Sequence, residues 1–152
     1  MPNPEPVDSD LDAVGPTRPS LPSWRHVLFV FIGGTIGTSA RAAIAADAPS
    51  AGGFPVAIFA INLVGAFLLG VVVEFLLVRG PDEGTRRSAR LFVGTGVLGG
   101  FTTYSTVATD AARLLVSAPL LAVGYLTATV LLGATASCAG IIVGRRLGRV
   151  GR

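Results

Sequence analysis

Four long stretches of this chain hold almost no charged residues, and they constrain its fold more than any other feature. Only 14% of the 152 residues are charged, whereas a soluble domain of this size has about 25%. Because roughly 20 apolar residues cross a bilayer as a helix, the stretches predict an all-α integral membrane protein with four transmembrane helices. We expect these spans over residues His26–Ala46, Phe54–Val78, Ala89–Leu115 and Leu120–Val143.

The segments outside the spans are too short or too polar to form another domain. Residues 1–22 are rich in proline, aspartate and serine, which predicts a disordered N-terminal tail. We expect one transmembrane domain over residues 23–147 and a short basic C-terminal tail over residues 148–152. The connectors between the spans are expected at Asp47–Gly53, Arg79–Ser88 and Val116–Pro119.

The charge distribution predicts how the chain is oriented. All 12 basic residues are arginine. Four spans place both termini and the central loop on one side of the membrane, where ten arginines fall, against Arg41 and Arg113 on the other side. This bias predicts cytoplasmic termini in a multi-pass protein of the cell membrane. The same rule explains the basic character, so we expect no nucleic-acid partner.

The third span is the most informative segment, because it reads GTGVLGGFTTYSTVATD from Gly94 to Asp110. Glycine is a poor helix former, and hydroxyl groups in a membrane need partners. The segment fits a broken helix whose carbonyls bind a cation and whose hydroxyls line an ion path. It fits equally well a helix with small residues for close packing. A dinucleotide-binding interpretation of its glycines is rejected, because the required strand and helix are missing.

Two polar residues stand out in the other spans. The carboxamide of Asn62 must be paired in hydrocarbon, so it either joins two helices or presents its NH₂ group to an anion. The sequence alone favours the first role. Arg41 is either an anchor that reaches the membrane interface or a buried structural cation. The sequence shows no carboxylate pair, metal cluster or nucleophile with a base, so we expect no enzyme.

Glycines spaced four residues apart predict where helices approach closely. Gly33 and Gly37 form such a pair in the first span, and Gly140 and Gly144 form one in the fourth. Gly65 offers a similar small surface in the second span. Membrane helices pack through small residues because burial from lipid supplies no hydrophobic gain. These glycines therefore predict packing faces and indicate nothing about transport.

Three motifs occur in the first three spans. The first span contains GGTIGTSAR (Gly33–Arg41), the second contains NLVGAF (Asn62–Phe67), and the third contains GGFTTYSTV (Gly99–Val107). Together they resemble the CrcB/Fluc family of fluoride channels, with Asp110 where the family usually has glutamate. The resemblance extends over residues 25–147 and implies a channel that passively exports fluoride and lowers its cytoplasmic concentration.

The resemblance also implies an architecture. Family members are antiparallel dimers with two pores, in which broken third helices cross around a central sodium ion. Carried over to this chain, the backbone carbonyls of Gly99 and Thr102 would bind Na⁺. The residues that would have structural roles around this centre are Arg41, Gly100, Thr103 and Asp110.

The pore that the resemblance implies must replace the water around fluoride with donors and with electropositive ring edges. The residues expected to line or border it are Asn62, Tyr104, Ser105, Thr106, Val107, Tyr125 and Thr129. Tyr104 and Val107 occupy the positions of two family phenylalanines, and valine has no ring edge. Together with the arginine bias, this leads to the hypothesis of a heterodimer with an oppositely oriented homologue. A homodimer is the alternative.

Two other functions are compatible with a small membrane bundle. The chain could be a non-conducting or partner-dependent subunit of a heterodimeric fluoride channel. It could also be a four-helix multidrug or cation antiporter, although such transporters need a carboxylate within the first span, which this sequence lacks. The expected partners are fluoride, membrane lipid and a second subunit.

Overall fold

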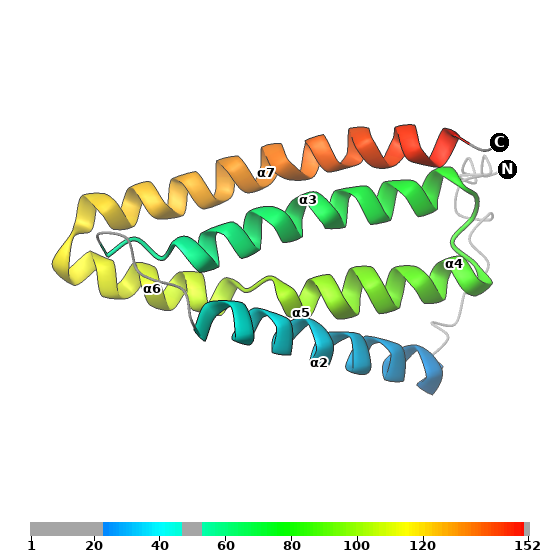
Figure 1. The fold of residues 1–152 in the computed structure, drawn as a ribbon, viewed down its shortest axis with the longest axis horizontal. Coiled ribbons are helices and arrows are strands. Elements are labelled where there is room, and N and C mark those ends of the chain that lie inside the picture. Colours follow the sequence, from blue (N-terminus) through cyan, green and yellow to red (C-terminus); the bar gives the residue numbers. More distant parts are fainter. Residues whose placement is uncertain (1–22, 47–52, 151–152) are drawn as a thin grey trace, which may run out of the picture.

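The computed structural model describes residues 23–46 and 53–150, and its elements are helices. Three of them are long: α2 (Trp24–Ala46), α3 (Val56–Val78) and α7 (Pro119–Arg149). A series of shorter segments lies between α3 and α7 along the chain. In order, these segments are α4 (Gly84–Ala89), the π-helical η1 (Arg90–Leu98), α5 (Gly99–Phe101) and α6 (Tyr104–Ser117). Figure 1 shows all the helices running roughly along the long axis of the molecule.

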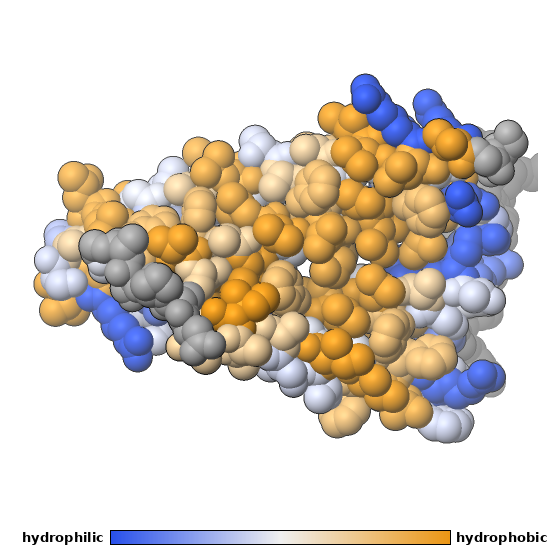
Figure 2. Space-filling view, viewed as in Figure 1, coloured by the Kyte–Doolittle hydropathy of each residue, from blue (hydrophilic) through white to orange (hydrophobic). Residues whose placement is uncertain are grey.

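Within the described residues, α2, α3 and α7 are long and apolar enough to cross a membrane. Large apolar side chains cover much of the surface (Figure 2), as with Leu120, which is 86% exposed. Such a surface is stable in lipid and unfavourable in water, so the chain is an all-helical, multi-pass membrane protein. The third predicted span is not one of the three helices, because the chain leaves the helical conformation at Thr102 and Thr103 and divides it.

Close backbone contacts occur at the glycines that the sequence singles out. A Cβ atom at Gly33 would lie 2.5 Å from the carbonyl oxygen of Phe92, and one at Gly37 would overlap that of Val97. Cβ atoms at Gly140 and Gly144 would overlap the backbone of α3. The predicted packing faces are therefore confirmed: α2 packs on η1 and α5, and α7 packs along α3.

Several helix boundaries differ from the sequence prediction. The last helix ends at Arg149 rather than at Val143, and α4 occupies part of the predicted connector Arg79–Ser88. A helix can continue past the apolar layer into water, and Arg146 and Arg149 complement the negative end of its dipole. The predicted disordered tail, residues 1–22, and most of the first connector lie outside the described residues.

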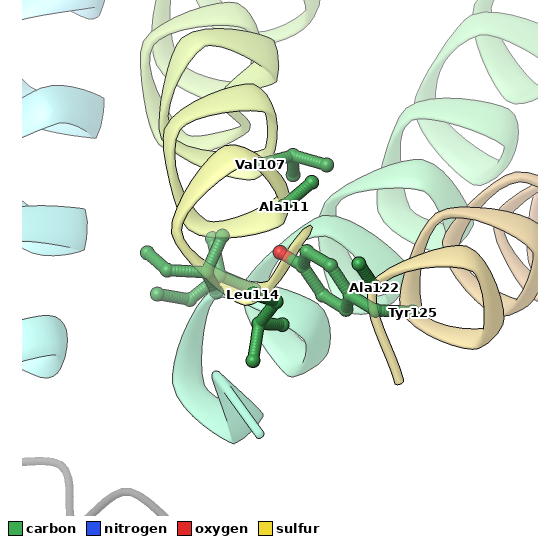
Figure 3. Packing of buried hydrophobic residues seen from close by; sticks show 7 residues of the cluster. Val107, Ala111, Leu114, Ala122 and Tyr125 are labelled. Atoms are coloured by element: carbon green, nitrogen blue, oxygen red, sulfur yellow. The ribbon is translucent and has the colours of Figure 1, made fainter. Parts of the chain in front are cut away.

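The buried core lies where α3, α6 and α7 meet (Figure 3). Tyr125 is its largest fully buried side chain, and its ring makes an edge-on contact with Phe54 at 5.4 Å between centroids and 87° between planes. The other members of the cluster are Ile58, Ile61, Val107, Ala111, Leu114 and Ala122. This core holds α6 against α3 and α7, and so determines the position at which α6 starts after the helix break.

Candidate functional site: a helix break and the cavity beside it

The central feature of the site is two residues of extended backbone between α5 and α6. Thr102 has φ −76° and ψ 157°, and Thr103 has φ −150° and ψ 127°. The break predicted around the threonine pair is therefore present. It frees backbone groups that a continuous helix would pair, and each of these groups needs another partner where it is buried.

Asn62 of α3 satisfies the backbone of Thr103 on both sides. The Thr103 amide donates to Asn62 Oδ1 at 2.8 Å, and Asn62 Nδ2 donates to the Thr103 carbonyl at 3.1 Å. One carboxamide thus pairs both the backbone N–H and the backbone C=O of Thr103. Asn62 therefore joins α3 to the helix break, which is the first of the two roles considered for it. Since Nδ2 carries two hydrogens, a second N–H group is not used by this pairing.

Thr103 also caps α6 and gathers the hydroxyl groups around the break. Its Oγ1 accepts from the Thr106 amide at 3.2 Å, as an N-cap side chain does. The same oxygen lies 3.2 Å from Ser105 Oγ and 3.1 Å from Thr106 Oγ1. The structure therefore brings Ser105 and Thr106 into one hydrogen-bonded group with Thr103 at the start of α6.

The carbonyls of Gly99 and Thr102 lose their usual helical donors at the break. In a continuous helix the Thr103 amide would donate to Gly99 and the Thr106 amide to Thr102, but these amides bond to Asn62 and to Thr103 Oγ1. Unwound backbone carbonyls are the ligands that bind Na⁺ in discontinuous membrane helices. The two carbonyls predicted to bind Na⁺ thus lack these helical partners, and sodium binding itself stays a prediction.

Gly100 connects the break to α2. Its carbonyl oxygen accepts from Thr38 Oγ1 at 3.3 Å and from Arg41 Nε at 3.4 Å, and its Cα packs on the backbone of Gly34. Arg41 is half-buried, which favours the structural cation over the interfacial anchor. Sequence reasoning missed Thr38, although it lies three residues before Arg41 and hence on the same helix face.

A cavity of about 260 Å³ opens beside the break, between α3, α6 and α7. Five of its lining residues were predicted from the sequence as pore or sodium-site residues, and Thr103 was predicted as a structural one. Leu126 and Val130 were missed, and each directly follows a residue that was predicted. The lining residues are Asn62, Thr102, Thr103, Tyr104, Val107, Leu126, Thr129 and Val130.

Other predicted residues lie apart from this cavity or have a second role. Tyr125 is in the core, and its hydroxyl has no hydrogen-bond partner among the described residues. Thr129 Oγ1 donates to the Tyr125 carbonyl at 2.7 Å. Val107 is 5% exposed and contributes to the core as well as to the cavity wall, whereas Tyr104 is 84% exposed. Asp110 lines a separate cavity of about 310 Å³ together with Arg113.

The fold and the site define a class: a helical membrane protein in which one segment, packed among the long helices, is broken by two residues of extended backbone. Comparison with known proteins identifies the family. Residues 28–141 match the family described as CrcB-like protein, Camphor Resistance (CrcB). The chain belongs to this CrcB family.

The chain is also similar to curated proteins over most of its length. It is 50% identical over 125 residues to fluoride-specific ion channel FluC 2 of Leifsonia xyli subsp. xyli, an alignment that covers 82% of this chain and 86% of the relative. It is 49% identical over 107 residues to FluC 1 of Cutibacterium acnes, covering 69% and 75%. It is 41% identical to FluC of Deinococcus radiodurans, covering 84% and 99%.

Proposed function

We propose that this chain is a subunit of a fluoride-selective channel that passively exports fluoride and lowers its cytoplasmic concentration. The similarity to proteins named as fluoride-specific ion channels over most of their length supports this function. The structural observation that supports it best is the break at Thr102–Thr103, held by Asn62 and bordered by a cavity. Passive conduction needs a lined path and no catalytic chemistry, so the function is not enzymatic.

The proposed arrangement in the membrane has four spans. The segment from α4 to α6 crosses as the third, with its break near mid-depth, and both termini face the cytoplasm. The start of α2, the C-terminal ends of α3 and α7, and α4 lie at one end of the molecule (Figure 1). Eight described arginines belong to or adjoin these segments, which supports this orientation. These residues are Arg25, Arg79, Arg86, Arg87, Arg90, Arg145, Arg146 and Arg149.

The proposed assembly is an antiparallel dimer with two pores. Tyr104 supports it, because an aromatic side chain that is 84% exposed next to the break is suited to contact with a second subunit. The carbonyls of Gly99 and Thr102 would bind the structural Na⁺ between the subunits. This ion would supply fixed positive charge near the centre of the dimer and hold the two breaks together.

Fluoride must exchange its water shell for protein donors along the pore. In this proposal the unused N–H of Asn62 and the hydroxyls of Ser105, Thr106 and Thr129 supply hydrogen bonds. The ring edge of Tyr104 supplies an electropositive contact. Tyr125 would contribute only if its buried hydroxyl became accessible in the assembled pore.

Val107 supports a heterodimer over a homodimer. Its side chain has neither an electropositive ring edge nor a hydrogen-bond donor, and it packs in the buried core. A homologue with an aromatic residue at this position, inserted in the opposite direction, would complete at least one pore. Relatives named FluC 2 and FluC 1 support a pairing of two such proteins.

Fluoride efflux from liposomes tests the function. The purified chain is reconstituted alone and together with a second homologue from the same genome, and efflux is followed with a fluoride electrode. We expect rapid fluoride efflux without chloride efflux and without a proton gradient. Proton-coupled efflux of organic cations would instead establish an antiporter, and no flux in any pairing would leave a non-conducting subunit. Full fluoride flux from the chain alone would refute the need for a partner.

A further inference from the structure

A polar recess of about 630 Å³ lies far from the helix break, between the start of α2 and the start of α4. Arg25 and His26 approach it from α2, and Arg87 approaches it from α4. Glu83 is the acidic residue of its lining, so the two arginines leave the recess with a net positive charge. The remaining lining residues are Ser23, Phe29, Gly84, Thr85 and Ser88.

An apolar groove of about 460 Å³ continues from this recess along α2. It shares His26 and Arg87 with the recess, so the two spaces meet at these side chains. The groove then follows α2 into the apolar part of the molecule, past Val27, Val30, Phe31 and Leu91. Together the two spaces form a site with a cationic end and an apolar end.

Two acidic side chains near this end of the molecule, outside the recess lining, are engaged elsewhere. Asp82 forms an ion pair with Arg90, and Glu74 forms one with Arg145, each at 2.7 Å. Within residues 23–46 and 53–150, neither Arg25 nor Arg87 forms an ion pair with a carboxylate. These two guanidinium groups can therefore bind an external anion.

We propose that the recess and groove together bind one anionic phospholipid. Its phosphate lies between Arg25 and Arg87, and an acyl chain lies in the groove along Val27, Val30 and Phe31. Basic pockets between membrane helices on the cytoplasmic side bind anionic head groups. Both volumes fall within the usual range of ligand sites, about 300–1,000 Å³. The continuity of charge and apolar surface matches a phospholipid better than a free phosphate ion.

The acidic segment of this chain over residues 1–22 is the competing occupant. It contains four acidic residues and one arginine, so its charge also complements the recess. Its composition is poor in apolar residues, so it offers little that could fill the groove. A lipid accounts for both halves of the site, and the segment accounts for one.

Native mass spectrometry of the full chain in detergent tests the proposal, with phosphatidylglycerol and phosphatidylcholine as probes. We expect preferential binding of phosphatidylglycerol, weakened roughly fivefold by Arg25→Gln or Arg87→Gln, since one arginine contributes about 1 kcal/mol near an anionic lipid surface. Val27→Trp, which fills the groove and keeps both charges, is expected to weaken binding as well. Arg146→Gln removes the same charge at the same end, outside the recess, and should leave binding unchanged.

Three results would overturn the proposal. Equal binding of the two lipids would show that the site does not discriminate by the charge of the head group. A loss of phosphatidylglycerol binding in Arg146→Gln as large as that in Arg25→Gln or Arg87→Gln would show a diffuse electrostatic effect. A tenfold or greater gain in phosphatidylglycerol binding after deletion of residues 1–22 would identify that segment as the occupant. Because this assay measures lipid binding alone, its outcome is independent of whether the chain conducts fluoride.

Discussion

Substituting Gly65 by alanine tests how the helix break is packed. A Cβ atom at this position would overlap Cγ2 of Thr102, whereas its next neighbour, Cδ1 of Phe101, lies at an ordinary 3.5 Å. Thr102 cannot rotate its methyl group away without moving Oγ1, which donates to the Leu98 carbonyl at 3.0 Å. Gly65→Ala must therefore either shift α3 away from the break or cost the Thr102 side chain its hydrogen bond.

The magnitude follows from two opposing effects. Overpacking a well-packed site costs about 1–3 kcal/mol, while alanine gains up to about 1 kcal/mol over glycine within a helix. We expect Gly65→Ala to lower the free energy of unfolding on the order of 1 kcal/mol. Thr102→Ser removes Cγ2 and keeps Oγ1, at a cost of roughly 0.8 kcal/mol for the lost methyl group. In the double variant the overlap is gone, so Gly65→Ala becomes neutral or stabilising there.

Titration with SDS in mixed micelles measures the free energy of unfolding, and liposome efflux reports whether the break still supports conduction. We expect a coupling energy between the two substitutions of about 1–3 kcal/mol in favour of the double variant. Gly133→Ala is the control, because a Cβ atom there meets nothing within 4 Å. If the free energy of unfolding of the double variant falls by the sum of the two single-variant losses, this description of the packing is refuted.

Three further predictions concern the break and the central loop. Asn62→Leu leaves the Thr103 N–H and C=O unpaired and should lower the free energy of unfolding by about 1–3 kcal/mol; unchanged stability in the SDS titration would contradict the pairing. Thr103→Val loses the cap of α6 and should cost about 0.5–2 kcal/mol, whereas Thr103→Ser should keep most of it. The hydrogen bond from Arg90 lowers the pKa of the Asp82 carboxyl from its ordinary value of 3.8. The pair therefore stabilises the fold fully above pH 3.8, and this stabilisation is lost as the pH falls through the lowered pKa. Thermal unfolding should therefore show a smaller loss of stability on acidification in Asp82→Asn than in the unchanged protein, and identical pH profiles would refute this.

The apolar stretches and the glycine pairs could be predicted from the sequence because they depend on local composition, whereas the break in the third segment was predicted through the family resemblance. Composition alone fits a broken and a continuous third helix equally well, since glycines followed by threonines are helical elsewhere, as at Gly34–Thr35 and Gly37–Thr38 of α2. The break lies at the predicted threonine pair. Glycine pairs predict close contact because of their size alone. The helix ends were less accurate, as at Arg149, because apolarity marks the lipid layer and does not mark where helical hydrogen bonding stops.

The roles of individual side chains in the site could be predicted only in part. Of the seven residues predicted for the pore, four line the cavity, namely Asn62, Tyr104, Val107 and Thr129. Ser105, Thr106 and Tyr125 are not among its lining residues. The functions predicted for the site residues in conduction and sodium binding remain predictions. Sequence spacing grouped Tyr125 with Thr129 on one face, but it could not show that the ring of Tyr125 is buried in the core.

The sequence by itself determined that this chain is a bundle of membrane helices, because apolar stretches long enough to cross a bilayer are a property of local composition. Local composition left open whether the third segment stays helical. Only the tertiary structure decided how the break is satisfied. Asn62 and Thr103 are 41 positions apart in the chain, and their pairing depends on the register between α3 and the third segment. That register is determined by close glycine contacts and the core around Tyr125, which bring together residues far apart in sequence.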